Sequence, residues 1–144
     1  MKIIFCSSNT IGSKLIRMVT WSKHSHVALV NGDEVIEATY PKVKVTPLNE
    51  ILSKHTNCVI VDIPCDDNKA IEAAKSQIGK PYDLKGMLGL AFNHDWQDDG
   101  QWWCSELVAW ALSQGDAKLF RDEVMHRITP QDLWKLNYPS HSIK

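Results

Sequence analysis

Short apolar runs dominate the first half of the chain, and longer amphipathic runs dominate the second half. Runs that alternate apolar with polar positions, or that are flanked by turn residues, are typical of strands. Strands are predicted at residues 2–7, 26–30, 34–38, 42–46 and 58–63. Helical spacing and helix-start signals predict helices at 11–20, 47–54, 66–78, 84–92 and 104–113, and another that begins at Thr129-Pro130. This order of elements predicts an α+β fold.

The segment Asn31-Gly32-Asp33 separates two of the predicted strands. Asn-Gly between two β-rich runs is the strongest short-range signal for a hairpin. We therefore expect strands 26–30 and 34–38 to pair, with Glu37 returning roughly opposite His26.

Composition and charge place the chain among ordinary globular proteins. It has 144 residues, 44% hydrophobic and 23% charged, with a net charge of −1. We expect a single domain over residues 1–144 and no nucleic-acid partner, because a basic excess is absent. No apolar run is long enough for a membrane span or a signal peptide, so a cytoplasmic protein is predicted. The oligomeric state stays open.

Three of the four cysteines carry no chemical signal. Cys6 and Cys58 lie in apolar strands, where cysteine is usually a small buried hydrophobe, and Cys65 follows a strand end. No C-x-x-C pair and no H-E-x-x-H motif is present, so spacing supports no zinc site, and no cofactor is predicted.

Cys104 differs because it stands at the predicted start of a helix. Unpaired N–H groups and the helix dipole favour an anion there, and a thiolate is a nucleophilic anion. Cys104 is therefore a candidate nucleophile, although a buried cysteine without a chemical role is also compatible with this position.

A cysteine nucleophile needs a base and a group that orients the base. His26 opens a predicted core strand, and Glu37 returns beside it among apolar neighbours, where an ionised carboxylate needs a partner. A satisfied strand-end histidine and a solvated glutamate are the alternatives. His24 lies two residues before His26, so a zinc site of His24, His26 and Glu37 is a further alternative.

Two segments of the chain resemble a known group of enzymes. Gly79-Lys-Pro-Tyr82-Asp83, followed by Trp103-Cys104-Ser105-Glu106-Leu-Val, resembles the NlpC-type cysteine peptidases. In those enzymes the histidine follows the cysteine, whereas here Ser25-His26-Val-Ala-Leu-Val-Asn-Gly-Asp-Glu-Val-Ile-Glu37-Ala precedes it. That order is similar to the circularly permuted branch of the papain-like superfamily, which includes YiiX/YycO-like hydrolases and lecithin-retinol acyltransferase-like enzymes.

The resemblance implies a fold and a set of site residues. The fold would be a small antiparallel sheet or half-barrel packed on helices. Cys104 would be the nucleophile, His26 the general base and Glu37 the residue that orients the imidazole. Tyr82 would line the cleft and assist the oxyanion, together with the backbone N–H of Cys104.

Trp103 and Ser25 flank these residues and are further candidates for oxyanion or substrate binding. Two positions depart from the NlpC-type pattern. Trp103 replaces an aspartate and Glu106 replaces a glycine, although C-S-E is usual in the YiiX-like group. These departures do not affect the assignment of Cys104 as the nucleophile. They do affect which chemical group of a substrate would bind beside it.

The implied reaction is acyl transfer through a thioester, without metal or cofactor. An amide or ester substrate is expected, with a cell-wall peptide as the favoured class by analogy. Two rival functions stay open: a binding module of the same fold, and a lipid-directed acyltransferase or thioesterase. The chain lacks a polybasic run, which disfavours the hypothesis of a lipid-directed enzyme.

Overall fold

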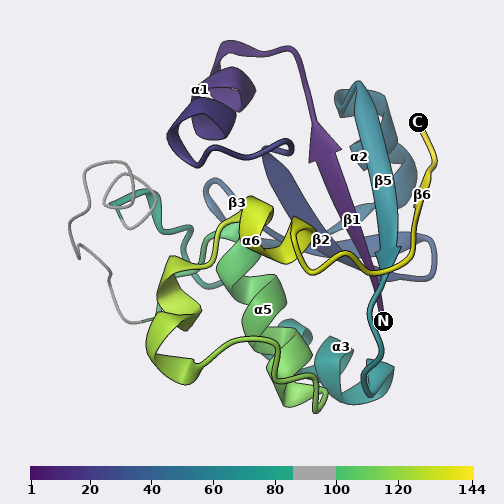
Figure 1. Ribbon diagram of the computed structural model, residues 1–144, viewed down its shortest axis with the longest axis vertical. Coiled ribbons are helices and arrows are strands. Elements are labelled where there is room, and N and C mark those ends of the chain that lie inside the picture. The colour runs from purple at the N-terminus through teal and green to yellow at the C-terminus, as the bar shows by residue number, and fades with distance from the viewer. Residues whose placement is uncertain (86–99) are drawn as a thin grey trace.

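A six-stranded antiparallel sheet forms the centre of the fold in the computed structural model, which describes residues 1–85 and 100–144 (Figure 1). The strand order is β4-β3-β2-β1-β5-β6. The strands are β1 (Lys2–Ser7), β2 (His26–Asn31), β3 (Glu34–Thr39), β4 (Lys42–Pro47), β5 (Asn57–Asp62) and β6 (Ser140–Ser142). The α+β prediction is confirmed, and the five predicted strands are all present.

Helices cover both faces of the sheet. They are α1 (Ile11–Val19), α2 (Leu48–Lys54), α3 (Asp67–Ser76), α5 (Cys104–Gln114) and α6 (Pro130–Trp134), with the 3-10 helix η1 (Asp122–Arg127) between the last two. The helix predicted at 66–78 is shorter, because Gln77 already serves as its C-cap. Most of the helix predicted at 84–92 lies outside the described residues. Neither η1 nor β6 was predicted.

Strand alternation divides the apolar residues between two cores. Ile3 and Phe5 of β1 face the larger core, which contains the buried side of α5. Ile4 and Cys6 face the smaller core, which α2 closes with Ile51. Because both faces of β1 are covered, the strand is apolar almost throughout, as a central strand should be.

Cys6 and Cys58 pair across β1 and β5, with both side chains fully buried. Their sulfur atoms are 3.1 Å apart, and both cysteines are free. They fill the smaller core as small hydrophobes, as the sequence predicts.

Two local sequence patterns form the structures that they predict, a hairpin and the N-terminus of a helix. Gly32-Asp33 connects β2 to β3, because Asn31 already pairs with Glu34, and Gly32 adopts a positive φ of 62°, which this tight turn requires. Thr129 caps α6 through a capping box with Asp132, and Pro130 takes the first helical position. The cap matters for the site because it holds the chain that borders the start of α5.

Candidate active site

Cys104 is the first residue of α5 and lies at the end of the helix that faces the cleft. The helix is held against the sheet by fully buried side chains, among them Leu107 and Leu112. Ser105 fixes its first turn by donating a 2.6 Å hydrogen bond to the carbonyl of Ile128. Trp103, the N-cap residue of α5, makes no side-chain capping hydrogen bond to this turn.

His26 and Glu37 form a close ion pair at the start of the sheet hairpin. The distance from His26 Nε2 to Glu37 Oε2 is 2.6 Å. The β2–β3 register pairs Leu29 with Ile36, so continuing it sets Glu37 beside Ala28. Glu37 is therefore a diagonal neighbour of His26, in keeping with the predicted position roughly opposite it, and its side chain spans the offset.

Two residues of β4 hold the other oxygen of Glu37. Thr46 donates a 2.6 Å hydrogen bond to Oε1, and the Lys44 ammonium lies 3.8 Å from the same atom. Burial would raise the pKa of Glu37, but the hydrogen bond and charge of His26, followed by Thr46 and Lys44, lower it to about 2. The carboxylate is therefore ionised. The sequence analysis missed both residues, although strand alternation at 42–46 already places them on one face.

The ionised carboxylate fixes the hydrogen-bonding roles of His26. A carboxylate only accepts, so Nε2 carries a proton and donates to Glu37, and Nδ1 is the ring nitrogen that this pair leaves over. Burial lowers the pKa of His26, but the hydrogen bonds to Cys104 and Glu37 and their charges outweigh it and raise the pKa to about 10. The imidazolium form is thus favoured beside the sulfur.

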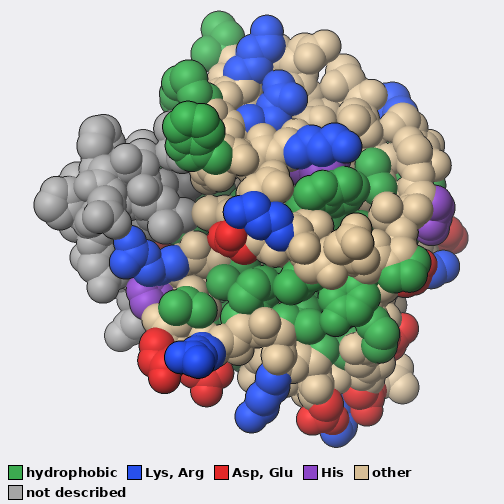
Figure 2. Space-filling view, in the orientation of Figure 1, with side chains coloured by type: hydrophobic (Ala, Val, Ile, Leu, Met, Phe, Trp, Pro, Cys, Tyr) green, Lys and Arg blue, Asp and Glu red, His purple; other side chains and the backbone are tan. Residues whose placement is uncertain are grey.

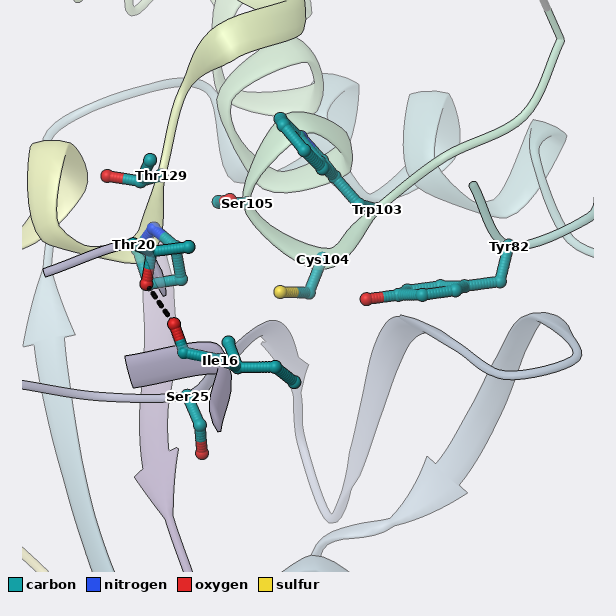
Figure 3. A pocket seen from close by; sticks show the side chains of 9 residues that line it. Ile16, Thr20, Ser25, Tyr82, Trp103, Cys104, Ser105 and Thr129 are labelled. Carbon is teal, nitrogen blue, oxygen red and sulfur yellow. Dashed lines mark hydrogen bonds between the residues drawn. The ribbon is translucent and has the colours of Figure 1, made fainter. Parts of the chain in front are cut away.

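Tyr82 reaches the site through two short backbone pairings. Its N–H bonds the carbonyl of Pro41, and the segment pairs with Trp102, two residues before Cys104. The Tyr82 hydroxyl points toward Cys104 (Figure 3). Burial, followed by the charges of Cys104 and Asp83, raises the pKa of Tyr82, so its hydroxyl keeps a proton that it can donate.

A cleft surrounds these residues, made of two adjoining pockets. One contains Cys104 and the other contains His26, and Ile16, Ser25 and Tyr82 line both. The Cys104 thiol points into the first of them (Figure 3). The shared lining residues therefore place the two candidate groups along one cleft.

Ser25 and Trp103 both line the Cys104 pocket, but their polar atoms are placed differently from the expectation. The Ser25 hydroxyl donates to the Cys6 carbonyl and contacts Ser13 Oγ at 2.7 Å. The Trp103 ring is turned away from the thiol (Figure 3), and its buried N–H has no partner among the described residues. Their expected roles in oxyanion or substrate binding stay predictions.

His24 does not join the His26–Glu37 pair. Strand β2 begins only at His26, so the two histidines do not share one strand face as the zinc alternative requires. The His24 ring is fully buried between Phe5 and Trp134, with ring centroids 5.4 and 4.6 Å away. Within residues 1–85 and 100–144, no three His, Cys, Asp or Glu side chains are grouped to hold a metal ion.

His55, at the C-terminal end of α2, is a residue that the sequence analysis missed. Its ring stacks on His26 at 5.9 Å between centroids, with 5° between the planes. Its Nδ1 donates to the carbonyl of Ile51. Burial and the charge of His26 lower the pKa of His55 despite the opposing Ile51 bond, so the imidazolium of His26 faces a neutral ring. No sequence signal indicated this stack, because it depends on how α2 packs.

The fold and these contacts define a papain-like arrangement in permuted order, with the histidine strand ahead of the cysteine helix. Residues 2–138 match the family described as permuted papain-like amidase enzyme, YaeF/YiiX, C92 family. The chain belongs to this family. The match extends beyond the segments that carry the resemblance, 25–38, 79–83 and 103–108, and takes in α1 and α6.

A solved structure with the same fold is the metalloprotein YiiX from Escherichia coli O157:H7. It superposes with a TM-score of 0.70 at 22% sequence identity, over 99% of this chain and 94% of that one. The likeness confirms the predicted fold. No curated protein sequence gives a significant match. Among the helices of the described residues, none combines the length and the apolar character that a bilayer span needs.

Proposed function

We propose that this chain is a cysteine amidase in which Cys104 is the nucleophile, His26 the base and Glu37 the orienting carboxylate. The observation that carries the proposal is the position of His26, whose Nε2 lies 2.6 Å from Glu37 Oε2 and whose pKa the neighbouring Cys104 thiol helps to raise. Covalent acyl transfer needs a nucleophile, a base beside it and a group that orients the base. The three residues supply one group for each of these roles. Membership of an amidase family supports the same reaction.

In the resting pair the Cys104 proton already lies on His26, so a thiolate stands beside an imidazolium. The thiolate then attacks the amide carbonyl carbon, and the oxyanion that forms accepts hydrogen bonds from the Cys104 backbone N–H and the Tyr82 hydroxyl. His26 returns the proton to the leaving nitrogen as the C–N bond breaks, which leaves a thioester on Cys104. Water, deprotonated by His26, attacks the thioester and releases the carboxylic acid and the thiol.

Cys65 provides an internal control for the reactivity of Cys104. Cys65 is the more exposed thiol, and burial raises its pKa, so it is a slow nucleophile near neutral pH. If the imidazolium of His26 stabilises a thiolate on Cys104, iodoacetamide at pH 6 should alkylate Cys104 more than about tenfold faster than Cys65, as measured by peptide mass spectrometry. Slower labelling at the buried Cys104 would contradict the proposal.

Turnover is tested with Cys104→Ala. We expect the variant to keep the thermal stability of the parent and to lose amide hydrolysis, with cell-wall peptide fragments as the first substrates to screen. Hydrolysis near the parent rate in the variant would exclude Cys104 as the nucleophile. A ligand that binds parent and variant equally, with no amide or ester turned over, would favour the binding-module alternative.

A further inference from the structure

Helix α1 and the residue that follows it expose an unusual set of large apolar side chains. Ile11 is 87% exposed, Leu15 51%, Met18 67% and Trp21 89%. The first three follow each other at spacings of four and three residues, so they form one stripe along the helix. Figure 2 shows hydrophobic side chains gathered over α1 beside lysine and arginine side chains. Exposed apolar stripes of this kind mark interaction surfaces.

The charged side chains within this segment of the chain have one sign. Lys14 lies between Ile11 and Met18 on the same side of the helix, and Arg17 and Lys23 flank it. The first acidic residue of the chain is Asp33, so the whole segment before it carries only basic charge. The chain has no polybasic run, yet the folded helix brings these charges together beside the apolar stripe. Such a surface is complementary to an anionic one.

The opposite side of α1 borders the cleft. Ile16 and Thr20 line the pocket that contains Cys104, and the buried Ser13 contacts Ser25. One helix therefore separates the site from solvent on one side and presents apolar and basic groups on the other. Whatever covers the stripe would lie next to the mouth of the cleft.

We propose that α1 and Trp21 form a docking surface for an anionic lipid bilayer. A short amphipathic helix with an apolar stripe, basic neighbours and a tryptophan at its end is suited to lie in the plane of a membrane interface. Docking in this way sets the cleft beside the lipid headgroups, so substrates would be reached at that surface. The docking itself does not depend on the proposed amidase chemistry.

The test is co-sedimentation with two kinds of vesicle: phosphatidylcholine alone, and phosphatidylcholine with an equal amount of phosphatidylglycerol. The Cys104→Ala variant is measured beside the parent, which separates binding from chemistry. We expect sedimentation with the mixed vesicles and weaker sedimentation with the neutral ones. Leu15→Ser should lower partitioning by at least about tenfold, because the apolar contact is lost. Lys14→Gln should lower it about fivefold, and only on anionic vesicles.

Matched control variants come from the rest of the surface. Ile78→Ser replaces an apolar side chain of similar exposure, 46%, and Lys118→Gln removes an exposed charge. Both should bind like the parent. The proposal is overturned if the parent fails to sediment with the mixed vesicles, or if the controls lose as much binding as the α1 variants. It is also overturned if Leu15→Ser abolishes a concentration-dependent dimer while no vesicle binding is seen, because a second copy would then cover the stripe.

Discussion

Two histidines that lie two residues apart show how surroundings decide the chemistry of one residue type. His24 is fully buried among Phe5 and Trp134, and within the described part of the chain neither of its ring nitrogens has a hydrogen-bond partner. His26 lies at the cleft and is bound to Glu37 and Cys104. Burial, and then the nearby Lys23 and Arg17 charges, lower the pKa of His24 to about 4, whereas the pKa of His26 rises to about 10.

The difference between the two rings arises from partners and not from depth. Burial disfavours the imidazolium at both positions, and only His26 has a carboxylate and a thiol that compensate. A buried histidine without partners is therefore a neutral packing group, and one with partners of opposite charge is a base held in its protonated form. Variants that remove one of the two rings, or the charge of the carboxylate, test this comparison directly.

The largest expected effect follows from removing His26. His26→Ala should lower the rate of Cys104 alkylation at neutral pH by at least about a hundredfold, because the thiolate loses its counterion and the thiol its base. His24→Phe, measured in parallel by the same mass-spectrometric assay, should stay close to the parent rate. Equal losses in both variants would mean that the effect comes from a disturbed fold and not from the loss of a base.

The sequence predicted the candidate site residues themselves, but it did not predict the β4 residues that contact Glu37. Cys104, His26 and Glu37 were recognisable because a helix start and a hairpin are local features that short patterns encode. Thr46 and Lys44 were missed because they act through the β3–β4 register. The role of β6 was also missed, since three exposed residues, Ser140–Ser142, carry no strand pattern and are held only by pairing with β5.

The position of His24 shows why the zinc alternative, which residue spacing left open, finds no support in the structure. Residue spacing placed His24 on one face with His26, which is valid only if both residues lie in the strand. The chain enters β2 at His26, and the bend before it turns the His24 ring toward Trp134 of α6. Contacts between segments more than a hundred residues apart are set by packing, so no local pattern could reveal them.

A smaller effect is expected when the carboxylate loses its charge. Glu37→Gln keeps the size of the side chain and an oxygen that accepts from Nε2, but it removes the charge that raises the pKa of His26. The imidazolium, which persists up to about pH 10 in the parent, should then lose its proton at lower pH. We expect Cys104 alkylation at pH 6 to fall about tenfold, with a lower titration midpoint for His26 by NMR.

Glu50→Gln is the matched control for that experiment. Glu50 is an exposed glutamate of α2 that pairs with Lys54 and does not contact His26. The control should leave both the alkylation rate and the His26 titration unchanged. An unchanged His26 titration in Glu37→Gln would show that the carboxylate does not set the charge state of the imidazole.

The smallest expected effect is on stability, and here the two histidines act in opposite directions. The unfolded chain protonates His24 near pH 6.5, whereas the folded chain does so only near pH 4, so His24 destabilises the fold as pH falls through that window. His26 has the opposite sign: its raised pKa gives stability that is fully present below about pH 6.5 and is lost as pH rises toward 10. The parent curve between pH 7 and 5 therefore combines opposing contributions, and His55, whose pKa burial also lowers, acts in the same direction as His24.

His24→Phe separates these contributions, because phenylalanine fills the site between Phe5 and Trp134 without a proton to bind. As the pH is lowered from 7 to 5, the free energy of unfolding of the variant should rise relative to that of the parent by on the order of 1 kcal/mol. Urea unfolding curves of both proteins at each pH measure this difference. The interval avoids Glu37, whose low pKa of about 2 affects stability only below about pH 4.5. Parallel curves for parent and variant would mean that water or a partner reaches the His24 ring, and the contrast with His26 would then rest on hydrogen bonding alone.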